Sequence, residues 1–260
     1  MNFKNISLLR KDQIGIITIE RKDIYNAIDL ETEMEIGSAV EMLEQESIGA
    51  MIITGAGEKA FSSGADIVPY IEMDLVKSIA YMKKLREVLW KIENCRKPVV
   101  AAINGFCLGG GFELALACHY RISSDHAVFG FPEINVGVFP GNGGSQRLAR
   151  LIGKGKALWY VTTGEQLKAD EAFMLGVIHK VVPHNQLMHA CEHFLTDCIL
   201  LKSPIALWAA ITSINKGIEM DLDSACQLDV TLASLCMGTD DFKEGVRAFV
   251  EKRKPVFKGN

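Results

Sequence analysis

Strand-like and helix-like segments alternate along the chain only as far as residue 183. Short apolar or β-branched runs lie at 14–19, 50–54, 99–103, 120–123, 127–129 and 177–182, with segments of helical spacing between them. Alternation of this kind favours largely parallel strands covered by helices. After residue 183 the spacing is helical throughout. We therefore predict an α/β body over 1–183 and a helical region over 184–260, which packs on the body or on a neighbouring subunit.

Several helix starts are marked by capping residues. Asp29, Asp221 and Thr239 each precede a segment of helical spacing, and Ser203 is followed by a proline. Short polar side chains at these positions accept hydrogen bonds from the free amides of a first helical turn. A long amphipathic helix is predicted over 74–93, and residues 58–70 are predicted to form a loop because they contain Ser, Gly and Pro.

The composition is that of an ordinary globular protein. Hydrophobic residues make up 48% and charged residues 23% of the 260 positions, and the net charge is −4. This excludes a disordered chain, and the chain lacks the positive field of a nucleic-acid binder. No apolar run reaches the ~18 residues of a membrane span, and the first residues lack the apolar core of a signal peptide. We expect a cytoplasmic protein with neither membrane nor nucleic acid as a partner.

The cysteines and histidines do not form a metal-binding pattern. There are seven cysteines, none in a CxxC pair, and the six histidines show no ligand spacing. We expect the cysteines to be small buried side chains in a reducing compartment, and we predict no metal site. The chain has no GxxxxGK[ST] segment, and residues 105–113 contain no GxGxxG, so a nucleotide cofactor is not expected.

Three consecutive glycines, Gly109 to Gly111, directly precede a predicted helix. The free amides of a first helical turn carry partial positive charge, and glycine lets a ligand approach the backbone. This suits an anion or a developing oxyanion. On the glycines alone, a tight turn or close helix packing explains the run equally well.

Two glutamates lie in apolar surroundings. Glu113 follows the glycines between Phe112 and Leu114, and Glu133 follows Pro132. Desolvation raises the pKa of such carboxyls toward the range used in acid–base catalysis. Taken singly, Glu113 could instead complement the helix N-terminus and Glu133 could be a surface turn residue.

The segment from Phe61 to Asp66 offers small residues after a predicted strand. Ser63 has no His or Lys in its local context, and the chain has no GxSxG segment. A nucleophilic serine is therefore not favoured, and Ser63 is interpreted as a donor through its backbone amide.

Together these segments resemble the enoyl-CoA hydratase/isomerase, or crotonase, family. The matching text is FSSGAD at 61–66, KPVVAAINGFCLGGGFELALAC at 97–118, FGFPEINVGVFPGNGGSQRLARLIG at 129–153 and EGVRAFVEKRKPVF at 244–257. The resemblance covers about residues 6–258. It implies a spiral of ββα units over 1–183, followed by a helical region over 184–260 for trimerisation and completion of the CoA site. Family members are commonly trimers or dimers of trimers.

The resemblance also implies the reaction and its residues. Backbone amides of Ser63 and Gly110 would hold the thioester oxygen, Glu113 would activate water, and Glu133 would deliver a proton. The implied activity is hydration of 2-enoyl-CoA to 3-hydroxyacyl-CoA, with CoA as part of the substrate and no further cofactor. The residues implied to bind substrate or CoA are Lys22, Ile24, Ala65, Asp66, Ile67, Phe131 and Lys252.

Two other activities remain open at this stage. The first is another acyl-CoA reaction on the same scaffold, such as double-bond isomerisation or hydrolysis. The second is a non-catalytic, RNA-associated binding protein, which the acidic balance of charges disfavours. Crotonyl-CoA separates them, because hydration, isomerisation and hydrolysis give different products.

Overall fold

A six-stranded sheet forms the centre of the molecule. The structure, a computed structural model, describes residues 3–260. The strand order is β1–β2–β3–β5–β7–β10, and every neighbouring pair is parallel except β1 with β2. The strands are β1 (Ile6–Lys11), β2 (Ile14–Ile19), β3 (Ala50–Gly55), β5 (Val99–Ile103), β7 (Tyr120–Ser124) and β10 (Lys180–Val182).

The two faces of this sheet are both apolar and belong to separate cores. Ile17 pairs with Ile53, and both point into the larger core, whereas their neighbours Ile16 and Ile52 point into the smaller one. This follows from the two-residue repeat of a strand, which sends successive side chains to opposite faces. The continuous apolar runs in the sequence are therefore strands buried on both sides, as parallel sheets require.

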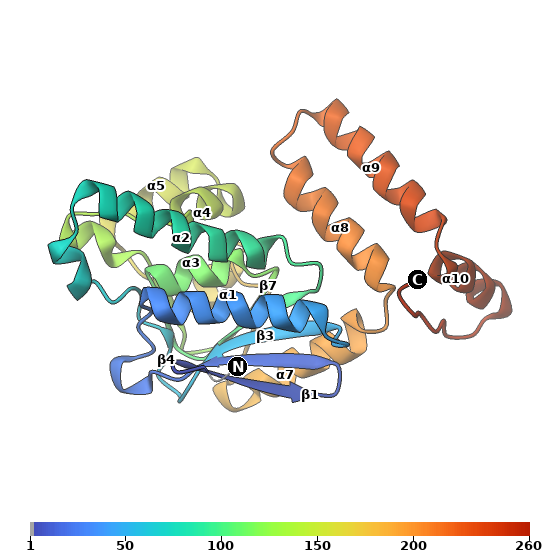
Figure 1. The fold of residues 1–260 in the computed structure, drawn as a ribbon, viewed down its shortest axis with the longest axis horizontal. Coiled ribbons are helices and arrows are strands. Elements are labelled where there is room, and N and C mark those ends of the chain that lie inside the picture. The colour runs from blue at the N-terminus through green and yellow to red at the C-terminus, as the bar shows by residue number, and fades with distance from the viewer. Residues whose placement is uncertain (1–2) are drawn as a thin grey trace.

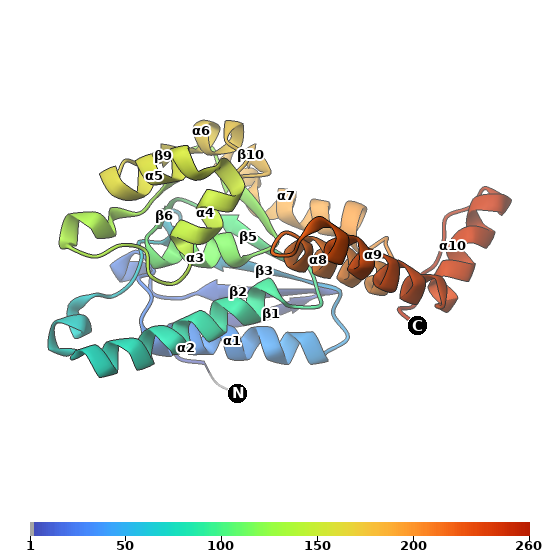
Figure 2. The same ribbon diagram turned by 90° about the horizontal axis from the view of Figure 1, so that it is seen from above.

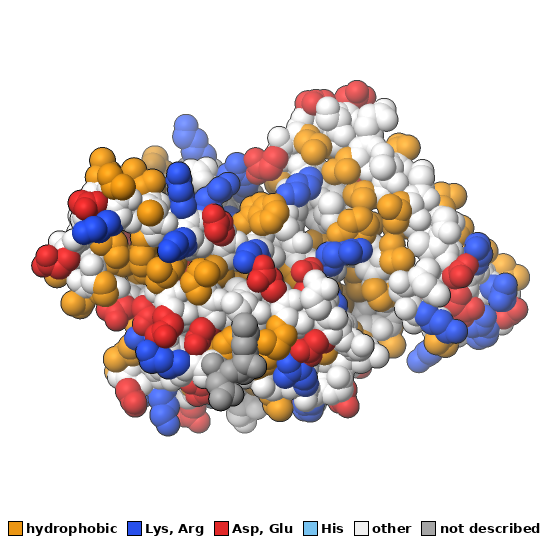
Figure 3. Space-filling model, in the orientation of Figure 1, with side chains coloured by type: hydrophobic (Ala, Val, Ile, Leu, Met, Phe, Trp, Pro, Cys, Tyr) orange, Lys and Arg blue, Asp and Glu red, His pale blue; other side chains and the backbone are white. Residues whose placement is uncertain are grey.

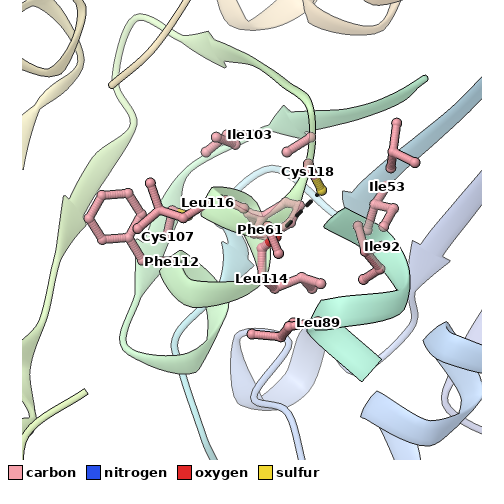
Figure 4. Close-up of a cluster of buried hydrophobic side chains, with 14 of the residues drawn as sticks. Ile53, Phe61, Leu89, Ile92, Ile103, Cys107, Phe112, Leu114, Leu116 and Cys118 are labelled. Atoms are coloured by element: carbon pink, nitrogen blue, oxygen red, sulfur yellow. Dashed lines mark hydrogen bonds between the residues drawn. The ribbon is translucent and has the colours of Figure 1, made fainter. Parts of the chain in front are cut away.

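Helices cover the two faces unequally (Figures 1 and 2). The larger core contains side chains of α1 (Leu30–Gln45), α2 (Leu75–Glu93) and α3 (Gly110–Ala117), whereas α7 (Leu187–Phe194) supplies side chains to the smaller core. Figure 4 shows Leu89 of α2, Leu114 of α3 and Phe61 meeting in the larger core. The site described below lies on the α1–α2–α3 side.

A second, four-stranded sheet completes a repeat of two strands and a helix. Its order is β4–β6–β8–β9, with β4 (Ala60–Ser62), β6 (Phe106–Leu108), β8 (Val128–Gly130) and β9 (Leu167–Lys168). Along the chain, β3, β5 and β7 enter the large sheet, and β4, β6 and β8 follow them into the small one. This recurrence confirms the predicted spiral of ββα units.

The remaining helices all come after β8 in the chain. They are α4 (Gly144–Ile152), α5 (Lys154–Thr163), α6 (Ala169–Met174), α8 (Pro204–Gly217), α9 (Leu222–Met237) and α10 (Asp240–Glu251). Short helical turns are η1 (Lys22–Ile24), η2 (Val68–Glu72), η3 (Pro132–Val136), η4 (His184–Gln186) and η5 (Leu195–Ile199). Helices α8, α9 and α10 project from the body (Figures 1 and 2).

The predicted caps are confirmed, and some strand boundaries are corrected. The carboxylates of Asp29 and Asp221 and the hydroxyl of Thr239 accept first-turn amide hydrogen bonds. Residues 58–70, predicted as a loop, contain β4 and η2, and the predicted strand 177–182 is reduced to β10. The apolar alternation that indicates a strand cannot be recognised at β4, because this strand is only three residues long.

The helical region does not separate cleanly from the body at residue 183. Helix α7 is part of the smaller core, so α8 is the first helix that leaves the sheet. The functional division into 1–183 and 184–260 stays a prediction.

Within residues 3–260, no single helix has the length and apolar composition to cross a membrane, although the bent pair 184–199 and 204–217 meets those two criteria jointly.

Candidate active site

A cavity of about 670 Å³ is lined by residues of α1, α2 and α3, of the turns η2 and η3, and of the loop before α4. It collects residues that are far apart in the chain, including three carboxyl side chains and two tyrosines. Its walls are otherwise mainly apolar. The lining residues that present polar side chains or backbone amides include Glu33, Ala65, Tyr70, Tyr81, Gly110, Glu113, Glu133 and Asn142.

Two unpaired backbone amides meet at this cavity. Gly110 is the first residue of α3, and within residues 3–260 neither its amide nor that of Ala65 donates a hydrogen bond to the protein. A methyl group built on Gly110 would lie 3.5 Å from the Ala65 nitrogen, so the two backbones are in close approach. An unpaired amide pair at a helix start can hold a negatively charged oxygen.

The prediction for Ser63 is corrected by its hydrogen bond. The Ser63 amide donates to the Tyr25 carbonyl at 2.9 Å, and Ser63 is not among the residues lining the cavity. The chain turns between Ser63 and Ala65 at Gly64, whose φ is +111°. The amide without a protein partner in this segment is therefore that of Ala65, which follows the turn at Gly64.

Glu113 is held at the cavity wall by backbone amides from a distant loop. It is 4% exposed, and its Oε1 accepts hydrogen bonds from the amides of Asn142 and Gly144, both at 2.8 Å. Burial raises the pKa of Glu113 to about 7, with a further increase from Glu133 and an opposing effect of the Gly144 amide. Glu113 therefore titrates near neutral pH.

Glu133 reaches the same cavity from η3. A methyl group on Gly109 would lie 3.0 Å from Glu133 Oε1, and Gly109 has φ +50°, so a glycine is required beside this carboxyl. Glu133 Oε2 is buried and has no hydrogen-bond partner within residues 3–260. Burial raises the pKa of Glu133 above its ordinary value. The structure thus brings Glu113 and Glu133 to one cavity, as the resemblance implied.

A third carboxyl, Glu33, was not predicted from the sequence. It belongs to α1, is 8% exposed and accepts a hydrogen bond from Asn142 Nδ2 at 3.1 Å. Burial, reinforced by Glu113, raises the pKa of Glu33 to about 8. The sequence signal that could have found Glu33 is its spacing. It lies three residues before Ile36 and therefore shares the apolar face of α1, where a carboxyl is buried.

The seven residues predicted to bind substrate or CoA do not all line the cavity. Ala65 and Ile67 line it, and Lys22 and Ile24 lie on the exposed turn η1, whose Ile24 carbonyl accepts from the Ser63 hydroxyl at 3.4 Å. Asp66 lies 3.9 Å from the Arg21 guanidinium and is not a lining residue.

Phe131 and Lys252 do not line the cavity either. Phe131 is fully buried and stacks on Phe112 with ring centroids 4.8 Å apart, so it supports the wall behind Gly144 and does not contact a ligand. The aromatic residue exposed at the cavity is Phe139. Lys252 is exposed where α10 ends and is not a lining residue.

No group of three or more potential metal ligands occurs within residues 3–260. All seven cysteines are free. Four of them, at positions 95, 107, 118 and 191, are buried, as expected of small apolar side chains, whereas Cys198 and Cys226 are exposed.

Comparison with known proteins gives concordant matches over the whole chain. Residues 10–260 match the family described as enoyl-CoA hydratase/isomerase. A short-chain-enoyl-CoA hydratase of Clostridium acetobutylicum is 38% identical over 98% of this chain and 97% of its own length. A crotonyl-CoA hydratase of Syntrophomonas wolfei is 38% identical over 99% of both chains.

Solved structures agree with this match. The crystal structure of an enoyl-CoA hydratase from Bacillus anthracis superposes with a TM-score of 0.94 at 35% identity, covering 99% of this chain and 100% of that one. A second enoyl-CoA hydratase structure, from Geobacillus kaustophilus, gives a TM-score of 0.95 at 31% identity and covers 100% of this chain and 98% of that one.

Proposed function

Because the chain belongs to the enoyl-CoA hydratase/isomerase family, we propose that it adds water across the double bond of 2-enoyl-CoA thioesters and forms 3-hydroxyacyl-CoA. The observation that carries the proposal is the arrangement of one cavity. Two buried carboxyls with raised pKa values, Glu113 and Glu133, lie beside the unpaired amides of Ala65 and Gly110.

The amide pair binds the thioester carbonyl oxygen in this mechanism. Addition at C3 moves electron density onto that oxygen, which becomes an enolate in the transition state. The amides of Ala65 and Gly110 are fixed by the backbone, so they need no reorganisation to stabilise the new charge. The N-terminus of α3 contributes in the same direction, because its partial charge is positive.

The two carboxyls handle the protons. Glu113, in its ionised form, takes a proton from water while the water oxygen bonds to C3. Its Oε1 is occupied by the amides of Asn142 and Gly144, which leaves Oε2 for the water. Protonated Glu133 gives its proton to C2 through the carboxyl oxygen that has no partner in the protein. Proton exchange between the carboxyls and solvent restores the starting state. The step uses no metal ion and no cofactor beyond the CoA of the substrate.

Binding of CoA requires cations, because the molecule is strongly anionic and this protein is net negative. We assign that role to Lys22 on the exposed turn η1 and to Lys252 supplied by a neighbouring subunit. This assignment requires self-association through α8–α10, as a trimer or a dimer of trimers.

We place the protein in the cytoplasm, where its free cysteines stay reduced.

The direct test is incubation with crotonyl-CoA, following loss of the conjugated thioester absorbance and identifying the product by mass. Hydration predicts a product heavier by one water and no free thiol. A shifted double bond without mass change would assign the cavity to isomerisation, and free CoA would assign it to hydrolysis. Binding without turnover, together with affinity for RNA, would contradict an enzymatic role.

A further inference from the structure

Glu33 and Asn142 form a polar pair at the wall of the acyl-CoA cavity. Asn142 Nδ2 donates to Glu33 Oε1 at 3.1 Å, and both side chains are more than nine-tenths buried. Within residues 3–260, Asn142 Oδ1 has no hydrogen-bond partner and no hydrogen bond reaches Glu33 Oε2. The pair therefore presents two unused polar atoms, and both residues line the cavity.

The position of this pair is fixed from several sides. The Asn142 amide donates to Glu113 at 2.8 Å, and its carbonyl accepts from Arg147 Nη1 at 3.1 Å. Arg147 is itself paired with Glu93 at 2.8 Å. These hydrogen bonds fix the Asn142 backbone, and the bond from Nδ2 to Glu33 Oε1 holds its side chain. A fixed, unsatisfied acceptor in a buried site costs free energy unless a ligand supplies a donor.

Glu33 offers the complementary donor. Burial and the nearby Glu113 raise its pKa to about 8, so at pH 7 the carboxyl is protonated and carries one O–H. The groups facing it are the Glu113 carboxyl from α3, the Asn142 amide and the hydroxyls of Tyr70 and Tyr81, which lie 3.4 Å apart. The lining residues include no Lys, Arg or His within the described part of the chain.

These features select among possible acyl substituents. A carboxylate would meet carboxyls and no cation. A hydrocarbon chain would leave both Asn142 Oδ1 and the Glu33 proton without a partner. A hydroxyl group matches both, because it accepts from Glu33 and donates to Asn142 at the same time.

We infer that Glu33 and Asn142 form a subsite for a hydroxyl group on the acyl chain, and that the preferred substrates are 2-enoyl-CoA esters with a hydroxyl beyond the double bond. The inference rests on the proposed function and extends it to the class of substrate. Because Asn142 also holds Glu113, the subsite lies close to the reacting carbons. Glu33 is a specificity-determining residue in this account and takes no part in proton transfer.

The test compares kcat/KM for trans-2-hexenoyl-CoA with the values for its 4-hydroxy, 5-hydroxy and 6-hydroxy derivatives at pH 7. We expect at least one derivative to exceed the parent ~10-fold or more, since an unpaired buried polar group typically costs that much. If the parent is hydrated and none of the three derivatives is preferred, the subsite is overturned while the proposed function stands. If no ester is hydrated, both fail.

Two variants separate recognition from folding. Glu33→Leu removes the donor but keeps the approximate size of the side chain. The kcat/KM for the preferred hydroxy derivative should then lie within about twofold of the kcat/KM for the parent ester. Glu33→Gln keeps an acceptor for Asn142 and a donor for the hydroxyl, so it should retain most of the ratio. Retention of the full preference in Glu33→Leu, or its complete loss in Glu33→Gln, would contradict the subsite.

Discussion

At the scale of single residues, the site depends on backbone direction as much as on side-chain chemistry. The apolar neighbours of Glu113 and Glu133 predict burial of both carboxyls, and the family resemblance pairs them. The proposed oxyanion donor could not be chosen in this way. Ser63 and Ala65 are both small residues in one segment, and only the hydrogen bond from Ser63 to Tyr25 and the turn at Gly64 distinguish them.

Proline substitutions test this distinction, because proline removes one amide donor. Ala65→Pro deletes an amide that has no partner in the protein, so we expect a fall in kcat of ~10²–10³ with little change in thermal stability. Ser63→Pro deletes the hydrogen bond to Tyr25 and should lower the unfolding temperature. Steady-state kinetics and thermal unfolding of both variants give the comparison. Normal turnover in a folded Ala65→Pro variant would exclude Ala65 as a donor.

At the scale of elements, helix caps and apolar periodicity are predictable, whereas contacts between distant elements are not. The caps at Asp29, Asp221 and Thr239 are local hydrogen bonds between residues three apart, so the sequence contains all the information they need. The contact of Glu33 with Asn142 joins α1 to the loop before α4, across 109 positions. Nothing in the spacing of either segment indicates that contact.

The buried carboxyl of α1 has a consequence for stability. Burial raises the pKa of Glu33 to about 8 in the native protein, whereas the pKa of the exposed carboxyl is 4.5. Between these pH values the unfolded chain releases a proton that the native state retains. Its stabilising contribution is therefore fully present below pH 4.5 and is lost as the pH rises through about 8. The full effect is on the order of 5 kcal/mol.

Glu33→Gln should remove this dependence. We expect the free energy of unfolding of the variant, relative to that of the unmodified protein, to increase by a few kcal/mol between pH 5 and pH 8. Denaturant unfolding of both proteins at the same protein concentration measures this difference. Glu113 also has a raised pKa, but it is present in both proteins and its contribution largely cancels. If the difference in unfolding free energy between the two proteins is the same at pH 5 and pH 8, Glu33 is ionised in the native state across this range.

At the scale of the whole molecule, the helices α8–α10 leave apolar side chains without cover. Leu222 is 81% exposed, Phe249 84% and Val250 74%, and Figure 3 shows hydrophobic side chains along α8 and α9. The alternating body could be predicted from local patterns, whereas the sequence does not show which helix faces pack within the chain and which pack on another copy.

Self-association should therefore depend on this surface. We expect the chain of 28.6 kDa to sediment as a trimer or a dimer of trimers. Combined Leu222→Asp and Phe249→Asp substitutions should shift it toward the monomer, because each places a charge in an apolar contact. Gln45→Asp, at an exposed position of α1 on the body, is the control for an added surface charge and should leave the assembly unchanged. A monomer before any substitution would contradict the assembly.

In the proposed mechanism, Glu113 and Glu133 act together on one water and one thioester. Its most direct test is the kcat for crotonyl-CoA hydration by the unmodified enzyme, Glu113→Gln and Glu133→Gln, with binding of the CoA ester measured in parallel. Each glutamine keeps the shape of the side chain but cannot exchange the proton, so kcat should fall at least ~100-fold while binding persists. Near-normal hydration by either variant would contradict the account.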